Sequence, residues 1–363
     1  MTPSSFVMAG GGTGGHVIPA LAVARELARR GHRVTFIGTR HGLEAALTAA
    51  EGFPIRFVET GALKGVSWRR RLRTLARLPV STAIAWRQLR RLGPVAVFST
   101  GGYAAGPVVM AAWLGRIPTI VMEANVVPGF TNRVMAARVR KALVSFAETI
   151  AFFPPGVAEL TGVPVRDKFF RLPPKPREET LTILITGGSQ GSRTLNRAVR
   201  ESWRWFAGGG PPVRLIHQTG RVGCEEIARE FARTGLAGEV TPYISEMPAR
   251  FAAADLVVSR AGAGAIAELA AAGKPSILVP FPFAADQHQS RNAEAMARAG
   301  GAVVVEDHAM SGERLFAEVR KLAEARPRLE GMGAAARRLA RPGAATRAAD
   351  LLEELGREGR KKD

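Results

Sequence analysis

One stretch near the start of the chain indicates the fold: VMAGGGTGGHVIPALAVARELARRGH, residues 7–32. A short apolar run enters a glycine-rich turn, and apolar residues at helical spacing follow the turn. The next apolar run, residues 33–37, predicts a second strand. A strand, a glycine turn, a helix and a further strand in this order are typical of a parallel sheet covered by helices.

The same order returns in the second half of the chain. A predicted buried strand at residues 182–186 runs into the glycine turn 187–191 and then into a helix. Two further stretches, residues 97–125 and 257–282, also share one order of strand, glycine turn, helix and strand. The sequence therefore predicts two doubly wound α/β domains, divided in the proline-rich tract near residues 154–176.

Composition limits the classes of function. The 363 residues carry 51 Lys and Arg against 31 Asp and Glu, a formal charge of +20, which favours anionic partners. The single cysteine, Cys224, excludes a disulfide scaffold and indicates a reducing cytoplasm. No apolar run approaches the ~18 residues of a spanning helix, so any membrane contact is expected at the surface.

The first glycine turn is compatible with several functions. Glycines 10, 12 and 15 satisfy G-x-G-x-x-G, which alone is a weak signal and also fits a purely structural turn. The second predicted strand ends without an acidic residue for a ribose, which disfavours NAD, whereas Arg40 leaves an NADP-dependent oxidoreductase open. Alternatively, the amide groups of this turn and of the turn 187–191 each bind a substrate that carries phosphate.

His16 stands at the start of the first predicted helix. A helix N-terminus disfavours an imidazolium, so the ring is expected to stay neutral near pH 7, as a general base requires. The alternative is a histidine that caps the helix or packs in the core.

Seven stretches of the chain, in order and spacing, resemble the bacterial MurG glycosyltransferases. They are GGGTGGHVIPALAVA, STGGYAAGPVVMAA, MEANVVPGFTNR, TGVPVR, GGSQGSRTLN, YISEMPARFAAADLVVSRAGAGAIAELAAAGKP and VPFPFAADQHQSRNA. The resemblance implies a GT-B fold, in which two Rossmann-like domains face a central cleft. It implies an acceptor-binding and membrane-associating domain at residues 1–160 and a UDP-GlcNAc-binding domain at 161–340. Residues 341–363 would form a helix that packs back on the first domain, and a basic tail.

The activity implied by the resemblance is inverting transfer of GlcNAc from UDP-GlcNAc to the C4 hydroxyl of the MurNAc of lipid I, which gives lipid II for peptidoglycan synthesis. By the same resemblance, the backbone of Ile244 reads the uracil and Glu268 binds the ribose diol. The implied donor-binding residues are Thr13, Gly14, Gly15, Asn125, Arg166, Ser189, Gly191, Ile244, Gly262, Ala263, Gly264, Ala265, Ile266, Ala267, Glu268, His288 and Gln289.

Two residues are candidates for the catalytic base of this reaction. His16 is favoured because it lies beside the glycine loop, and Glu123 is the rival because it follows a strand end. No Asp-x-Asp occurs in the sequence, the spacing by which many sugar-nucleotide transferases hold a divalent ion. We therefore expect metal-independent chemistry and no cofactor, with helix dipoles, amides and arginine meeting the charge of the departing UDP.

Residues 68–93 mix clustered arginines with apolar side chains. The predicted membrane patch consists of Leu72, Leu75, Leu78, Trp86 and Trp113. Such a stretch suits an anionic membrane surface, and lipid I carries an undecaprenyl tail, so we expect a peripheral protein on the cytoplasmic face of the plasma membrane. The alternative is a helix that packs its leucines on the sheet and leaves its arginines in solvent. Other cell-wall synthesis proteins are further candidate partners.

Three rival functions stay open at this level. A GT-B transferase for another acceptor is the nearest, because acceptor contacts are poorly read from sequence. An NADP-dependent oxidoreductase would leave the turn GGSQGS without a role. A nucleic-acid binder would explain the charge but has no recognised motif, so no nucleic acid is expected as a partner.

Overall fold

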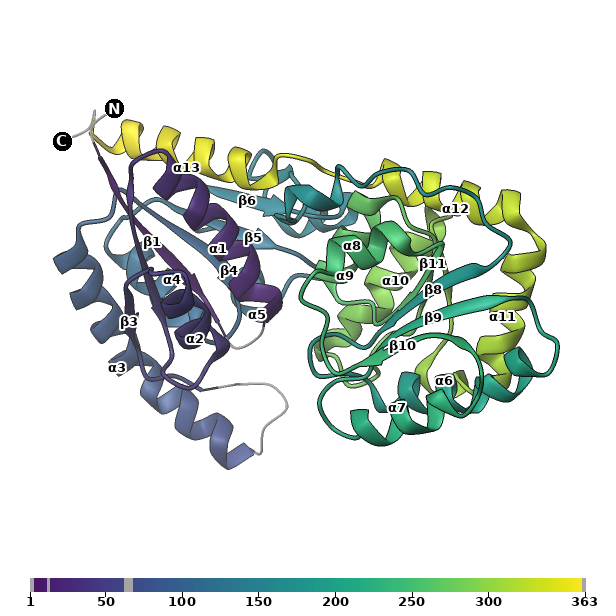
Figure 1. The fold of residues 1–363 in the computed structure, drawn as a ribbon. Helices are drawn as coiled ribbons and strands as arrows, with labels where there is room; N and C mark the ends of the chain where they lie inside the picture. The colour runs from purple at the N-terminus through teal and green to yellow at the C-terminus, as the bar shows by residue number, and fades with distance from the viewer. Residues whose placement is uncertain (1–2, 12–13, 62–67, 361–363) are drawn as a thin grey trace. The chain divides into compact units, whose positions relative to one another are not determined.

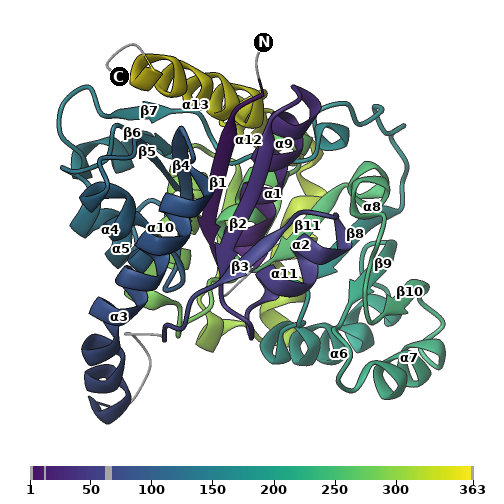
Figure 2. The same cartoon turned by 90° about the vertical axis from the view of Figure 1, so that its left-hand side faces the viewer.

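The computed structural model describes residues 3–11, 14–61 and 68–360, without the side chains of 69–73, 75, 359 and 360 (Figures 1 and 2). The chain forms two compact units. Unit 1 comprises residues 1–165 and 343–363, and unit 2 comprises residues 166–342. Each unit contains one parallel sheet with helices on its faces, which confirms the fold class predicted from the sequence.

In unit 1, the described residues form a parallel sheet with the strand order β3-β2-β1-β4-β5-β6-β7. The strands are β1 (Ser5–Gly10), β2 (Arg33–Gly38), β3 (Ile55–Phe57), β4 (Ala96–Gly101), β5 (Thr119–Glu123), β6 (Lys141–Val144) and β7 (Ala158–Leu160). The helices are α1 (Gly14–Arg29), α2 (Leu43–Ala50), α3 (Trp68–Leu92), α4 (Ala105–Leu114), α5 (Phe130–Met135), the 3-10 helix η1 (Ala147–Phe152) and α13 (Ala344–Arg360).

The first strand shows why this sheet is covered on both faces. Successive residues of a strand point to opposite faces, and β1 is apolar at every central position. Phe6 and Met8 join a core cluster with residues of α1 and α13. Val7 and Ala9 join a second cluster, with residues of α3 and α4. Burial on both sides explains the continuous apolar run in the sequence.

The C-terminal helix α13 belongs to unit 1, where it packs beside α1 (Figure 1). Leu352 of α13 is fully buried in the cluster beneath α1. The guanidinium of Arg30 donates to Asp350 over 2.7 Å and lies 3.3 Å from a carboxylate oxygen of Glu353. The helix therefore packs against the core that β1 and α1 form. It continues to Arg360.

In unit 2, the described residues form a parallel sheet with the strand order β10-β9-β8-β11-β12-β13. The strands are β8 (Leu181–Thr186), β9 (Val213–Gln218), β10 (Ala237–Thr241), β11 (Leu256–Ser259), β12 (Ser276–Leu278) and β13 (Ala302–Val304). The α-helices are α6 (Arg193–Ala207), α7 (Cys224–Ala232), α8 (Met247–Ala253), α9 (Ala263–Ala272), α10 (His288–Arg298), α11 (Gly312–Glu324) and α12 (Arg326–Arg338). The 3-10 helices are η2 (Asp167–Phe169), η3 (Ala285–Gln287) and η4 (Asp307–Ala309).

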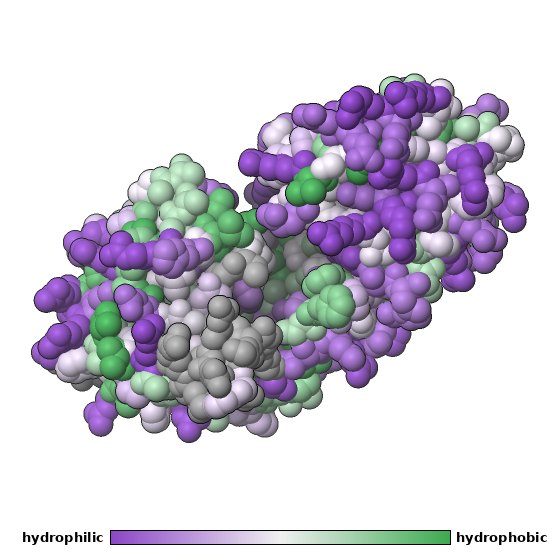
Figure 3. Space-filling view, turned by 90° about the horizontal axis from the view of Figure 1, so that it is seen from below, coloured by the Kyte–Doolittle hydropathy of each residue, from purple (hydrophilic) through white to green (hydrophobic). Residues whose placement is uncertain are grey.

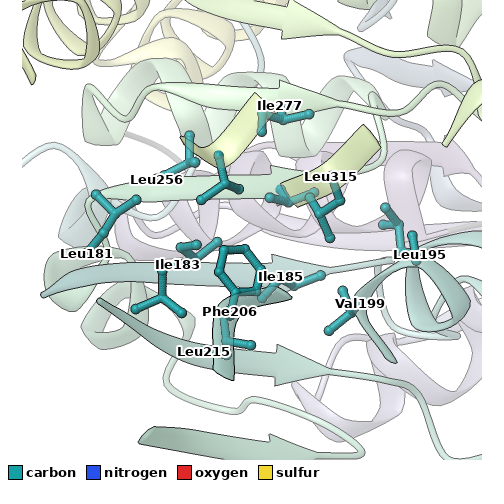
Figure 4. Close-up of a cluster of buried hydrophobic side chains, with 14 of the residues drawn as sticks. Leu181, Ile183, Ile185, Leu195, Val199, Phe206, Leu215, Leu256, Ile277 and Leu315 are labelled. Carbon is teal, nitrogen blue, oxygen red and sulfur yellow. The ribbon is translucent and has the colours of Figure 1, made fainter. Parts of the chain in front are cut away.

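The core of unit 2 forms between its strands and the helices α6, α7, α11 and α12. Alternate residues of β8 project to one face of the sheet, where α6 contributes side chains at helical spacing (Figure 4). The labelled side chains in this core are Leu181, Ile183, Ile185, Leu195, Val199, Phe206, Leu215, Leu256, Ile277 and Leu315. This packing holds the carboxyl ends of β8, β9 and β11 in fixed register.

In both sheets the strand order reverses beside the first strand. In unit 1 the chain runs outward from β1 on one side and from β4 on the other, and β8 and β11 have the same relation in unit 2. Ligands of doubly wound folds bind at the carboxyl ends of the strands where the order reverses. The loops after β1, β4, β8 and β11 are therefore the positions at which to search for a site.

Candidate active site

In unit 2, the glycine loop after β8 packs closely against the loop after β9. Gly191 has a left-handed backbone with φ of 75°, and a Cβ there would lie 1.9 Å from the carbonyl oxygen of Thr219. No other residue fits this approach without displacing the backbone. At the end of the loop, Ser192 Oγ accepts the amide of Leu195 over 3.3 Å and caps α6. The loop is thus held at its C-terminal end, while Ser189, which precedes these two residues, is exposed.

The start of α9 has the features of an anion-binding position. Gly262 precedes the helix in an extended conformation and makes no side-chain capping bond. A Cβ added to Gly262 or Gly264 would meet no heavy atom within 4 Å, and neither residue has a positive φ. The fold itself therefore does not require glycine at these two positions. The side chain of glycine is a single hydrogen atom, so a phosphate can approach the backbone amides of this first helical turn closely.

Arg166 and Glu268 lie together beside this helix start. Arg166 Nη2 is 3.9 Å from Glu268 Oε1. The side chain of Glu268 is 31% exposed, yet the protein removes enough water from its carboxyl group that burial raises the pKa to about 7, against the opposing effect of Arg166. The structure thus brings together the two charged residues that the resemblance assigns to the donor.

The loop between β12 and α10 carries two further predicted residues. Gln289 Oε1 accepts the amide of Phe281 over 3.0 Å, and His288 Nδ1 donates to the carbonyl three residues before it over 2.6 Å. Asp286 and Gln287 are both left-handed, with φ of 52° and 53°. Such strain costs about 1–3 kcal/mol per residue and persists where the surroundings over-determine it, often at ligand sites.

Ile244 is buried in the loop between β10 and α8. Its amide donates to Gln218 Oε1 over 3.2 Å. Its carbonyl is the group that would accept the N3–H of a uracil ring. The backbone of Ile244 is therefore oriented by a side chain from β9, which sequence reasoning did not single out.

Arg260 is a second residue of this site that sequence reasoning missed. Its Nη1 donates to the carbonyls of Val279 and Pro280 over 3.1 and 3.2 Å, and to Asp307 Oδ1 over 2.5 Å. The guanidinium thus fastens the ends of β11 and β12 to η4. The signal in the sequence was the arginine of SRAGAG, directly before the turn into α9.

In unit 1, His16 is the third residue of α1 and is half-buried. Gly102 follows β4 with φ of 83°, and a Cβ there would lie 2.5 Å from the carbonyl oxygen of Gly11 and 3.5 Å from His16 Nδ1. The loops after β1 and β4 therefore touch, with the His16 ring at their contact. Gly14 and Gly15 form the first turn of α1, and Thr13 lies outside the described residues.

A buried carboxylate lies against the first glycine loop, and the sequence analysis did not identify it. Glu44 Oε1 accepts the amide of Thr39 over 2.9 Å and its hydroxyl over 2.7 Å. A Cβ on Gly11, Gly38 or Gly42 would approach Glu44 to 2.4, 2.6 or 2.0 Å, so glycines surround this carboxylate. An anion at Gly11 would meet its negative charge, which makes this loop less suited to phosphate than those of unit 2.

Glu123, the rival base, is buried and fully engaged in hydrogen bonds. Its Oε1 accepts the backbone amide and the side-chain amide of Asn125 over 3.0 and 3.1 Å. Its Oε2 accepts the amide of Gly129 and the side-chain amide of Asn132, each over 2.9 Å. These four donors make Glu123 the support of the loop between β5 and α5. The geometry favours this structural role for Glu123, and His16 remains the candidate base.

The long helix α3 has two kinds of face. Ala85 and Leu89 are buried against the sheet and α4, as the packing alternative predicted. Val80, Ile84 and Trp86 are exposed. Leu78 is half-buried, and the side chains of Leu72 and Leu75 lie outside the described residues. One helix therefore both covers the core and presents apolar side chains to solvent.

Trp113 and Leu114 at the end of α4 extend this exposed apolar surface, with 43% and 59% of their surface exposed. Arg138 stacks on Trp113 and Arg90 on Trp86, with 5.2 and 4.8 Å from guanidinium carbon to ring centroid. Figure 3 shows hydrophobic side chains standing out among hydrophilic ones on the molecular surface. None of the described helices is long and apolar enough to cross a bilayer.

Comparisons with known proteins agree with this fold. Residues 6–144 match the glycosyltransferase family 28 N-terminal domain, and residues 182–355 match the glycosyltransferase family 28 C-terminal domain. The chain is 32% identical to a solved structure of MurG from Acinetobacter baumannii, with a TM-score of 0.81 over 97% of this chain and 100% of that one.

Two relatives carry one and the same name, UDP-N-acetylglucosamine--N-acetylmuramyl-(pentapeptide) pyrophosphoryl-undecaprenol N-acetylglucosamine transferase. The protein from Solibacter usitatus is 60% identical over 98% of this chain and 97% of its own length. The protein from Myxococcus xanthus is 40% identical over 96% of this chain and 92% of its own length.

The open space at Gly264 generates a prediction. Gly264→Ala should leave the melting temperature unchanged or higher, because alanine favours a helix by up to about 1 kcal/mol. The same methyl group should raise the Kd for UDP-GlcNAc roughly tenfold, because it would separate the diphosphate from the α9 amides. Titration calorimetry measures the Kd for UDP-GlcNAc of the variant and of a control. The control is Gly331→Ala, in α12, where a Cβ also meets no atom within 4 Å. An unchanged Kd in Gly264→Ala would place the diphosphate elsewhere.

A second prediction follows from Glu268. With a pKa of about 7, its carboxyl is mostly protonated at pH 6 and mostly ionised at pH 8. Only the ionised form accepts both ribose hydroxyls, so the affinity for UDP-GlcNAc should rise roughly tenfold from pH 6 to pH 8. The diphosphate of UDP-GlcNAc does not titrate in this range. Glu268→Gln should remove most of this pH dependence of the affinity. An equally steep pH dependence in that variant would exclude Glu268 as its cause.

Proposed function

The chain belongs to the MurG family of glycosyltransferases, and on this premise we propose that it moves N-acetylglucosamine in a single inverting displacement that needs no metal ion. The transfer itself, from UDP-GlcNAc to an undecaprenyl-pyrophosphoryl N-acetylmuramyl-pentapeptide, follows from the family. The acceptor atom is the C4 hydroxyl of the muramyl sugar, and the product is lipid II for peptidoglycan synthesis. Unit 2 binds the donor, and unit 1 binds the acceptor.

The observation that carries the donor assignment is the uncapped start of α9, with Arg166 and Glu268 beside it at the switch point of unit 2. The first amides of α9 bind the diphosphate. Glu268 accepts the two ribose hydroxyls. The carbonyl of Ile244 accepts the uracil imide hydrogen.

The remaining donor contacts surround the sugar and the diphosphate. Ser189 and Gly191 contribute from the loop after β8, and His288 and Gln289 bind sugar hydroxyls from the loop before α10. The resemblance also assigns Gly14, Gly15 and Asn125, which belong to unit 1, to the N-acetylglucosamine. These contacts rest on the resemblance, on the exposure of Ser189 and on the backbone bonds that hold His288 and Gln289 in place.

Departing UDP gains negative charge as its bond to the sugar breaks. The positive end of the α9 dipole and the guanidinium of Arg166 oppose this charge at fixed positions. The absence of Asp-x-Asp from the sequence supports a mechanism in which these groups replace a divalent ion.

His16 takes the proton in the displacement. The C4 oxygen of the muramyl sugar attacks the anomeric carbon of N-acetylglucosamine as its hydroxyl proton passes to the ring of His16. The bond from that carbon to the UDP oxygen breaks with its electron pair, and attack from the opposite face inverts the configuration. Glu123 keeps its four donors throughout and supports the loop that carries Asn125.

The apolar surface of unit 1 supports docking on a membrane. Trp86, Trp113 and Leu114 would enter the headgroup boundary, while Arg90 and Arg138 beside the tryptophans meet anionic lipid. An acceptor with an undecaprenyl tail stays in the membrane. We therefore place the enzyme on the cytoplasmic face of the plasma membrane as a peripheral protein.

The role of His16 is tested by turnover. UDP release from UDP-GlcNAc should require a lipid I analogue and should persist in EDTA. His16→Ala should lower kcat by roughly 10² to 10⁴, since a general base contributes that much, with little change in the Kd for UDP-GlcNAc. The matched control is His41→Ala, an exposed histidine of the same unit. Normal turnover in His16→Ala would remove His16 from the chemistry, and loss of turnover in EDTA would refute the metal-free mechanism.

Membrane docking is tested with vesicles that contain anionic phospholipid. The double variant Trp113→Ser/Leu114→Ser should lower the bound fraction in co-sedimentation, with partitioning weakened roughly tenfold or more by the lost apolar burial. High salt should lower wild-type binding, because the Debye length falls from about 10 Å at 0.1 M to about 3 Å at 1 M. The control, Val222→Ser, changes a residue of unit 2 that is 87% exposed. Equal binding by the double variant and this control would contradict the proposed surface.

A further inference from the structure

Gln218 is a buried polar residue to which neither the mechanism nor the resemblance gives a role. It ends β9 and is 1% exposed. Its Nε2 donates to the carbonyl of Gly188 over 2.8 Å, and its Oε1 accepts the amide of Ile244 over 3.2 Å. One side chain therefore bridges the loop after β8 and the loop before α8.

The partners determine the orientation of this amide group. A carbonyl oxygen can only accept and a backbone N–H can only donate, so Nε2 must face Gly188 and Oε1 must face Ile244. The carbonyl of Gly188 also accepts the amide of Gly191 over 2.9 Å, which closes the turn of that loop. Gln218 thus holds the turn that the proposed function assigns to the diphosphate.

The residues beside Gln218 make the same segment rigid. His217 is buried and its Nε2 lies 3.1 Å from Asn196 Oδ1, while Asn196 Nδ2 donates to the carbonyl of Thr219 over 2.9 Å. Burial lowers the pKa of His217 to about 4, so the ring is neutral at physiological pH. The end of β9 is therefore an uncharged, fully packed support between α6 and the two loops.

We propose that Gln218 is a positioning residue with two roles: it holds the backbone of Ile244 for recognition of the nucleobase, and it holds the turn at residues 188–191 for binding of the diphosphate. This inference rests on the proposed function of the site. Through its acceptor, Gln218 holds the backbone of Ile244, whose carbonyl distinguishes uracil, with a donor at N3, from cytosine, with an acceptor there. Through its donor, Gln218 holds the turn at Gly188. Loss of the first bond removes the acceptor of the buried Ile244 amide, and loss of the second leaves the Gly188 carbonyl with the Gly191 amide alone.

Two substitutions separate the two bonds. Leucine at position 218 removes both the acceptor for Ile244 and the donor for Gly188. Glutamate keeps an acceptor for Ile244 but turns a charged oxygen toward the Gly188 carbonyl and toward an incoming diphosphate. Gln88→Leu is the matched control, because Gln88 also donates to a backbone carbonyl, that of Phe57 over 2.9 Å, but lies in unit 1.

The experiment titrates the full-length chain with UDP, CDP and inorganic pyrophosphate in a calorimeter and records the melting temperature of each variant. Gln218→Leu should raise the Kd for UDP roughly 10- to 100-fold and should lose most of the preference for UDP over CDP. Gln218→Glu should weaken UDP, CDP and pyrophosphate alike and keep the wild-type preference for UDP over CDP. Gln88→Leu should match the wild type in all three titrations.

The outcomes distinguish this inference from the function on which it rests. Wild-type preference and affinity in both variants would overturn the role of Gln218 while leaving UDP binding intact. Failure of the wild type to bind UDP would overturn the proposed function, and this inference with it. If Gln218→Leu does not fold, Gln218→Glu decides alone: weakened binding with retained preference supports the two positioning roles, and either lost preference or unchanged binding contradicts them.

Discussion

The structure depends on how backbone groups are satisfied just beyond the ends of the parallel strands. Within each sheet the ladders pair the backbone N–H and C=O groups of the central strands, but the loops that leave the carboxyl ends have no ladder partner. Side chains supply the missing partners there. Gln218 bridges two loops in unit 2, and Glu123 accepts four donors in unit 1. Because these side chains fix the conformation of the loops, the residues proposed to bind substrate do not have to stabilise the loops themselves.

The two units meet this requirement with different side chains. Under the loops of unit 1 lie two buried carboxylates, Glu44 and Glu123. At the loops of unit 2 lie a neutral amide, Gln218, and two guanidinium groups, Arg166 and Arg260. The diphosphate is proposed to bind in unit 2, where both guanidinium groups lie, each beside a carboxylate. On the proposed function, one topology supports two different tasks.

Two helices that are far apart in the sequence cover the sheet of unit 1, and one of them also presents apolar side chains to solvent. The helix α3 closes one side of the unit 1 core with Ala85 and Leu89 and presents Trp86 to solvent. The helix α13 completes the opposite side of the same core, although some 180 residues of unit 2 separate it from the rest of unit 1. A periodicity that fits both a core helix and a helix with an exposed apolar face was ambiguous in sequence, because α3 packs on the core and also presents apolar side chains to solvent.

The sequence alone determined the fold class and the strands and helices that flank each glycine loop, because burial of a parallel sheet on both faces leaves continuous apolar runs, and tight turns leave glycines. It also indicated His16, Glu268 and the start of α9 by resemblance. Only the tertiary structure revealed that Glu123 accepts four hydrogen bonds and that Gln218 bridges Gly188 and Ile244. Such partners lie on separate strands and loops, and no local pattern records which donor will meet which acceptor once the strands are in register.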